Sequence, residues 1–132
     1  MNEVIELHDS DLAAVEFANE TAILSLRPAY IHRSEGRPGI DAGSGWIQDA
    51  TLTIFAAESV VPPSRLPATI WDGFFRVGNH TYDNTIPVAA SFDGAIELHI
   101  VLNSSETVTI RGERIEIALM GRARYVEEFP RN

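Results

Sequence analysis

Apolar and polar residues alternate most regularly in the second half of the chain. Between residues 95 and 103, isoleucine or leucine occupies every second position, and the positions between them are mostly polar. A period of two residues is the pattern of a β-strand that buries one face. The same alternation over 107–111 and 114–120 predicts two further strands, so this half is expected to form a meander of antiparallel strands.

The residues between these apolar segments are those that tight turns favour. Gly78-Asn79 separates the predicted strands 74–77 and 80–83, which indicates a two-residue hairpin turn. Such signals recur at the spacing that is typical of sandwiches and barrels. The other expected turns are Asp93-Gly94, Asn103–Glu106 and Gly112-Glu113.

The start of the chain leaves two interpretations open. Val4–Leu7 is predicted to be a short strand, and Asp9–Ala14 could form a helical turn capped by Asp9 or Ser10. Residues 13–18 could continue that helix. The alternating side chains at 13, 15 and 17 favour a strand instead.

Two long strands are predicted next, over Thr21–Arg33 and Trp46–Glu58. Val60–Pro67 contains three prolines and is expected to be an extended crossover, because proline cannot pair within a central strand. The expected inward-facing residues of the long strands are Leu24, Leu26, Tyr30, His32, Leu52 and Ile54. The whole chain, residues 1–132, therefore predicts a single all-β domain, an antiparallel β-sandwich or flattened barrel of about eight to ten strands.

Composition narrows the function classes. The chain has 132 residues and a formal net charge of −9, so nucleic acid and anionic membranes are not expected partners. Its first 20 residues contain six acidic residues and no basic one, unlike a signal peptide, and the predicted location is the cytoplasm. The absence of cysteine and lysine rules out disulfides, thiolate chemistry and Schiff bases.

No group of residues forms a recognisable catalytic motif. His8-Asp9-Ser10 contains the residue types of a hydrolase triad, but consecutive side chains cannot form its relay. The four histidines lack metal-ligand spacing, and neither a calcium loop nor a phosphate-binding glycine motif is present. No cofactor or metal is therefore predicted. His32 is interpreted as a half-buried, hydrogen-bonded side chain, and Glu127-Glu128 as a solvated strand edge.

The segment Arg33–Gly45 is the candidate for binding. It contains four glycines, one proline and charges of both signs, which predicts a long exposed loop between two strands. Loops on a rigid β-scaffold often carry binding function, and aromatic residues and arginine are enriched at binding sites. The predicted binding residues are Tyr30, His32, Arg33, Glu35, Arg37, Asp41 and Trp46.

These observations favour a non-catalytic binding or assembly domain that contacts a protein partner or a second copy of itself. The alternative is a closed barrel whose interior binds a small apolar ligand. A metal-dependent hydrolase built on His8, Asp9 and a distant histidine is the least favoured alternative. The first two differ in whether the large rings line one concave pocket or fill a packed core. These rings are Tyr30, His32, Trp46, Trp71 and Tyr82.

Overall fold

The chain is built entirely from antiparallel strands. A computed structural model describes residues 1–130, and within that range there are nine strands and no helix. The all-β prediction and the expected number of strands are confirmed. The strands are β1 (Asn2–Glu6), β2 (Asp11–Ala18), β3 (Thr21–Ser34), β4 (Gly43–Phe55), β5 (Ala68–Val77), β6 (His80–Asp83), β7 (Thr85–Pro87), β8 (Ser91–Leu102) and β9 (Thr107–Phe129). No helix among the described residues has the length and hydrophobicity that crossing a membrane requires.

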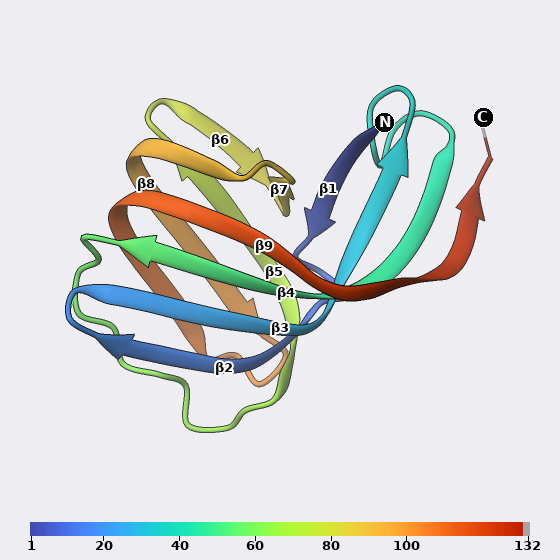
Figure 1. Ribbon diagram of the computed structural model, residues 1–132. Coiled ribbons are helices and arrows are strands. Elements are labelled where there is room, and N and C mark those ends of the chain that lie inside the picture. The colour runs from blue at the N-terminus through green and yellow to red at the C-terminus, as the bar shows by residue number, and fades with distance from the viewer. Residues whose placement is uncertain (131–132) are drawn as a thin grey trace.

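All strands belong to one sheet that closes partly on itself. Its order is β2-β5-β8-β9-β4-β3-β1-β7, β6 pairs with β5, and β2 also pairs with β3. This extra pairing joins β2, β5, β8, β9, β4 and β3 into a ring, on the left of Figure 1. The ring is weakest between β2 and β5, which share only the pairs Asp11↔Thr69 and Leu12↔Ala68. The fold is thus a flattened, partly closed barrel.

Three strands extend beyond the ring. The second half of β3, the first half of β4 and the end of β9 continue together and are joined by β1 and β7. We call this five-stranded extension the wing; it rises on the right of Figure 1. The loop over residues 35–42 connects β3 to β4 at the tip of the wing.

The three long strands bend where the wing leaves the ring. The pairing of β3 with β4 shifts between Leu26 and Ala29, around Pro28, which has no N–H group to donate. The pairing of β4 with β9 shifts at Gln48, where Gly121 has a positive φ of 74°. Since these irregularities lie side by side, all three strands turn at the same level.

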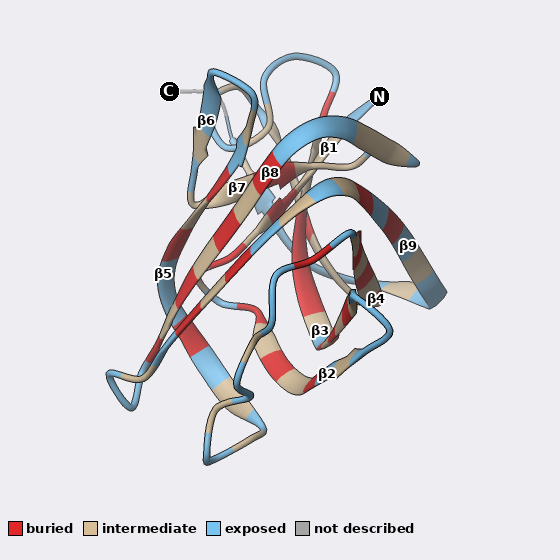
Figure 2. Ribbon diagram, turned by 90° about the vertical axis from the view of Figure 1, so that its left-hand side faces the viewer, coloured by how far each residue is buried: buried red, intermediate tan, exposed pale blue. Residues whose placement is uncertain are grey.

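One apolar cluster runs through both the ring and the wing. Buried residues alternate with more exposed ones along the strands, as Figure 2 shows in red, tan and blue. Leu24, Leu52, Phe75 and Leu98 in the ring are fully buried, and Ile5, Ile31 and Ile86 of the wing belong to the same cluster. Each fully buried side chain of this size contributes about 1.5–3 kcal/mol. The predicted inward faces of β3 and β4 are thus confirmed at Leu24, Leu26, Leu52 and Ile54. The prediction is wrong at Tyr30 and His32, because the irregularity around Pro28 shifts the alternation and brings their neighbours Ala29 and Ile31 into the apolar cluster instead.

Two predicted turns are wrong because their glycines lie inside strands. Gly112-Glu113 does not turn: β9 runs without interruption from Thr107 to Phe129. A Cβ atom at Gly112 would lie 2.5 Å from Ile54 Cγ2, so the glycine allows β9 to pack closely. Asp93-Gly94 lies within β8, where Gly94 adopts a φ of 129° at a bulge. The hairpin at Gly78-Asn79 and the loop at 103–106 are confirmed.

Other predicted element boundaries also differ from those in the structure. The helical turn over 9–14 is wrong and the strand over 13–18 is confirmed, because a tight turn at Asp9 leads directly into β2. The loop between β3 and β4 covers 35–42, not 33–45, since Ser34 pairs with Gly43. β4 ends at Phe55, not at residue 58. Val60–Pro67 contains no strand, as expected, and β5, β8 and β9 lie side by side, as a meander requires.

Candidate binding site

The wing has two faces with different chemistry. Residues directly opposite one another on antiparallel strands share a face, and the pairs Glu6↔Tyr30, His32↔Gly45 and Gly45↔Glu127 define one of them. We call it the hollow face, and Phe129 also lies on it through its pairing with Gly43. The opposite face carries the buried isoleucines of the wing together with Arg33 and Trp46.

His32 is at the centre of the hollow face. Its Nε2 atom forms a short hydrogen bond with the Glu6 carboxylate, and its side chain is 12% exposed. The imidazole stacks on Phe129 with ring centroids 4.6 Å apart, and the Tyr30 ring lies on another side at 5.1 Å. Nδ1 is buried and has no hydrogen-bond partner among residues 1–130. The prediction of a half-buried, hydrogen-bonded histidine is confirmed, and these contacts fix the orientation of its ring.

Tyr30 connects β3 to the end of β9. Its hydroxyl donates a 2.8 Å hydrogen bond to Glu127 Oε1, crossing β4 above Gly45. Any side chain at Gly45 would collide with that hydroxyl, so the glycine is required for the contact. Burial, then the hydrogen bond and the negative charge of Glu127, raise the pKa of Tyr30 above its ordinary value of 10.0. Glu127 is exposed, as expected of a solvated edge, but its bond to Tyr30 was not anticipated.

The 35–42 loop is held over this face by short hydrogen bonds. Ser34 Oγ donates to the Ala42 carbonyl at 2.7 Å and accepts from the Gly36 N–H. The backbone N–H of Arg37 donates to Asp41 Oδ2 at 2.7 Å, and this bond lowers the pKa of Asp41 below its usual range. These bonds hold the loop in one shape, although most of its residues are exposed, as predicted.

Two adjoining cavities lie between this loop and the wing. They have volumes of about 380 and 310 Å³ and share His32, Gly39 and Ile40 as lining residues. Pockets for small ligands begin at roughly 300 Å³. Together we call them the hollow. The first is completed by Val4, Glu6, Pro38, Asp83, Asn84 and Thr85, and the second by Asp41, Phe129 and Pro130.

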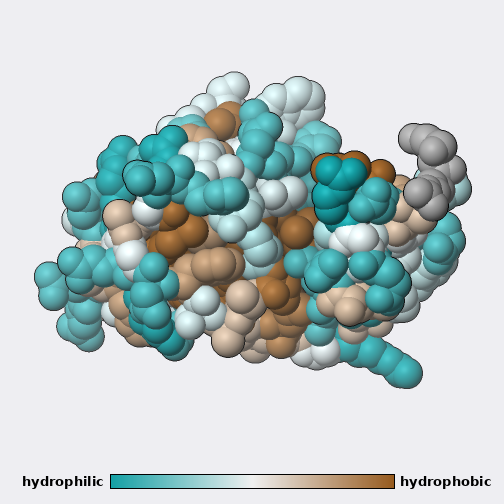
Figure 3. Space-filling model, turned by 90° about the horizontal axis from the view of Figure 1, so that it is seen from above, coloured by the Kyte–Doolittle hydropathy of each residue, from teal (hydrophilic) through white to brown (hydrophobic). Residues whose placement is uncertain are grey.

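The lining of the hollow is acidic and partly apolar. It contains the carboxylates of Glu6, Asp41 and Asp83, and none of the described lining residues is an arginine. Ile40 adds an apolar side chain that is 70% exposed. Seen from above, hydrophobic surface is exposed among hydrophilic side chains at the end of the molecule where the wing lies (Figure 3). Such a lining suits a ligand that carries positive charge beside an apolar group.

The structure divides the predicted binding residues between two faces. His32 and Asp41 line the hollow, and Tyr30 packs beside His32 without lining it. Glu35 and Arg37 lie in the loop with side chains 83% and 73% exposed. Arg33 and Trp46 are on the opposite face. There, the Arg33 guanidinium pairs with Glu3 and lies 4.5 Å over the ring of Trp46.

The remaining large rings do not join this site. Tyr82 stacks on the buried Phe75 at 5.8 Å, and Trp71 is 64% exposed, with its edge against His8. Of the five rings that were expected to distinguish a pocket from a packed core, only His32 lines the hollow. Both cavities of the hollow therefore lie beside the 35–42 loop and not among these other rings.

Several residues of the hollow could not be identified from the sequence. Glu6, Asn84 and Phe129 come from three distant segments. The register of β1, β3, β4 and β9 brings Glu6 and Phe129 to His32, and the pairing of β7 with β1 places Asn84 beside them. Ile40 did give a signal, since an apolar residue among the glycines of a loop is unusual.

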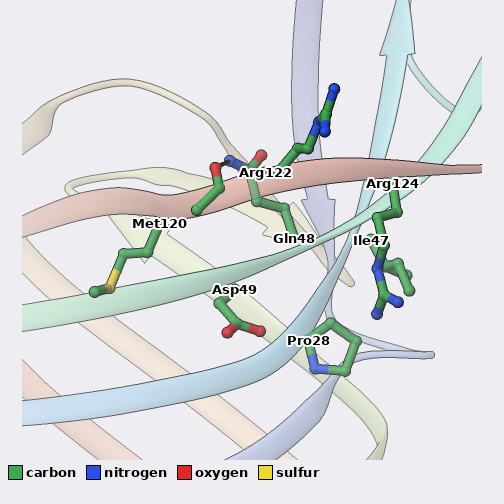
Figure 4. Close-up of a pocket in the computed structure, with 8 residues that line it drawn as sticks. Pro28, Ile47, Gln48, Asp49, Met120, Arg122 and Arg124 are labelled. Carbon is green, nitrogen blue, oxygen red and sulfur yellow. Dashed lines mark hydrogen bonds between the residues drawn. The ribbon is translucent and has the colours of Figure 1, made fainter.

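A smaller cavity of about 140 Å³ lies at the bend. Gln48 donates to the Gly121 carbonyl at 2.9 Å, and Asp49 pairs with Arg27 at 3.2 Å. Figure 4 shows that Arg122 and Arg124 leave β9 in different directions, so their guanidinium groups do not converge on a common point. The two arginines therefore do not form a binding site for an anion in this cavity.

Metal binding has no support in the described part of the chain, where no three histidine, aspartate or glutamate side chains come together as ligands.

Comparison with protein-family models, with curated proteins and with solved structures found no match to this chain.

Proposed function

We propose that the protein is a non-catalytic binding domain that takes a positively charged group in the hollow. The group is an ammonium or guanidinium on an apolar stem, as in a lysine or arginine side chain of a peptide or protein partner. The observation that carries this proposal is the lining: three carboxylates and no arginine surround two adjoining cavities that also present Phe129 and Ile40.

The carboxylates differ in their availability to a ligand. The Asp41 carboxylate accepts a hydrogen bond from the backbone N–H of Arg37, and one oxygen of Glu6 is hydrogen-bonded to His32. Asp83 forms no hydrogen bond or ion pair through its side chain with any residue in 1–130, which leaves it free to accept from a ligand. A charge-assisted hydrogen bond of this kind contributes about 1.5–3 kcal/mol.

The charge of the whole molecule supports the same ligand class. A net charge of −9 attracts cations over distances longer than any single contact. Phe129 and Ile40 would cover the apolar stem while the charged end reaches Asp83 and Glu6. The expected affinity for an isolated side-chain analogue is weak, with a Kd of about 1 mM, because few atoms make contact.

Three blocked amino-acid amides test the proposal by NMR titration of the full chain. N-acetyl-arginine amide carries the cation, N-acetyl-citrulline amide has nearly the same shape without charge, and N-acetyl-glutamate amide is anionic. We expect saturable shifts at Ile40, Asn84 and Phe129 with the arginine amide alone. Salt should weaken this binding, since it screens exposed charges.

Matched variants assign the binding to the hollow. Asp83→Asn should weaken the arginine amide several-fold, whereas Glu113→Gln, an exposed carboxylate on the ring, should not change it. Equal binding of the citrulline amide, or saturable shifts confined to other surfaces, would overturn the proposal.

A further inference from the structure

The end of β9 is an unpaired edge of the sheet. β8 pairs with β9 only as far as Ser91↔Glu116, and Ile117 N–H then donates to the Ala90 carbonyl at 3.0 Å. Beyond this point β9 has β4 on one side, and no other described strand pairs with its second side. The backbone N–H and C=O groups on that side are available to another strand.

Exposed apolar side chains concentrate along this edge. Met120, Tyr125 and Val126 are 43%, 53% and 43% exposed. The other large apolar residues with this exposure, among residues 1–130, are scattered over four separate segments: Met1, Ile40, Val61 and Trp71. An edge strand that is long, exposed and apolar is the kind of surface that pairs with another chain.

The charges along the edge complement each other when the strand is reversed. Arg122 and Arg124 precede Tyr125-Val126, and Glu127-Glu128 follow it. Within the described residues neither arginine forms an ion pair, although most other arginines do. An antiparallel copy of the strand, centred on Tyr125-Val126, places its Glu127 opposite Arg124 and its Arg124 opposite Glu127, with Arg122 diagonally across from Glu127 of the copy.

We propose that two copies of the chain pair antiparallel through residues 122–129 of β9, so that their two wings form one continuous sheet. The dimer has two-fold symmetry, with the same surface used by both copies. A second copy is the occupant that this edge fits, because one sequence supplies both halves of the charge pattern. Local attraction at the edge offsets the repulsion between two molecules of net charge −9.

The pairing and the ligand use different groups, although Phe129 belongs both to the paired segment and to the lining of the hollow. The pairing uses the free backbone edge of β9, whereas the hollow lies on the face of the wing. A chain that stays monomeric would not contradict the proposed ligand binding. A hollow that binds no ligand would not contradict the proposed dimer.

Sedimentation equilibrium of the full chain over a range of concentrations tests the proposal. The wild type should show a reversible monomer–dimer equilibrium. Arg122→Glu combined with Arg124→Glu makes the edge uniformly acidic and should weaken the dimer by about tenfold or more, equivalent to ~1.4 kcal/mol. Arg37→Glu combined with Arg65→Glu changes the net charge equally on exposed loops, and should weaken the dimer much less.

A charge exchange separates edge pairing from other effects. Glu127→Arg alone should also weaken the dimer, and mixing this variant with the Arg122→Glu/Arg124→Glu variant should restore a heterodimer, provided both give the wild-type circular dichroism spectrum. Hydrogen exchange should show amides of 122–129 protected more strongly as concentration rises. A wild type that stays monomeric at ~500 μM, a dimer that survives charge reversal, or a mixture that fails to associate would overturn the proposal.

Discussion

Single glycines decide how closely the strands approach in two places. Gly45 leaves room for the Tyr30 hydroxyl to reach Glu127, and Gly112 lets β9 pack against Ile54 and the Phe55 carbonyl. Neither glycine lies in a turn, and neither has a positive φ. What matters at both positions is that glycine has no side chain. The prediction of a turn at Gly112 was wrong for this reason.

Gly112→Ala should lower the free energy of unfolding by about 1–3 kcal/mol, because the added methyl group must displace packed atoms. Its Cβ would lie 2.5 Å from Ile54 Cγ2 and 2.6 Å from the Phe55 oxygen. Urea denaturation measures the change. The neighbouring exposed substitution Glu113→Ala should stay within ~0.5 kcal/mol of the wild type. Equal stability of Gly112→Ala would show that β9 does not pack this closely.

Tyr30 makes stability depend on alkaline pH. Its pKa is higher in the folded chain than its ordinary value of 10.0, so above pH 10 the unfolded chain releases a proton that the folded chain keeps. Stability is therefore fully present below pH 10 and falls as the pH rises above it, with a limiting slope of ~1.4 kcal/mol per pH unit.

Tyr30→Phe removes this contribution. The variant should be about 0.5–1.5 kcal/mol less stable at neutral pH and should lose stability less steeply above pH 10. Tyr82→Phe, which removes a hydroxyl without a hydrogen-bond partner among residues 1–130, serves as the control. Identical alkaline slopes for the wild type and Tyr30→Phe would contradict the buried bond to Glu127.

At the scale of elements, strands could be predicted and their pairing could not. Alternation identified the strand segments because burial of one face imposes a period of two. Nothing in that period shows that β9 continues through Gly112 or bends at Gly121. The hollow depends on this register, since Phe129 reaches His32 only if β9 extends along β4 to Gly43.

The 35–42 loop should matter for binding more than for stability. Replacing it by Asn-Gly removes the hydrogen bonds of Ser34 and Asp41, but it shortens the loop, and each halving of length recovers ~0.6 kcal/mol. We expect the free energy of unfolding to stay within about 1 kcal/mol of the wild-type value.

The same variant should no longer bind the arginine amide, because Gly39, Ile40 and Asp41 are lost from the hollow. Isothermal titration and urea denaturation of this one variant separate the two effects. Strong destabilisation with binding retained would mean that the loop supports the fold and the ligand binds elsewhere.

At the scale of the whole molecule, the ring and the wing are expected to unfold as one cooperative unit. β3, β4 and β9 run through both, and the buried isoleucines of the wing belong to the same apolar cluster as the ring. Because the wing shares its strands and its core with the ring, we expect it not to unfold separately from the ring.

Trp71→Phe leaves Trp46 as the single tryptophan, and Trp46 lies in the wing against Tyr125. Its fluorescence and the far-ultraviolet circular dichroism of the whole chain should change at the same denaturant concentration, measured at one fixed protein concentration. An earlier transition in fluorescence would show that the wing opens before the ring.

The shared bend separates two regions that should tolerate substitution differently. Residues that pack the ring must keep their volume, because neighbouring atoms surround them on all sides. Ile40 and Asp83 are both exposed and line the hollow, so substitution at either position changes few buried contacts. Substitution there would change the proposed ligand site while the ring stays intact. The specificity of that proposed site could therefore change at exposed positions with little loss of stability.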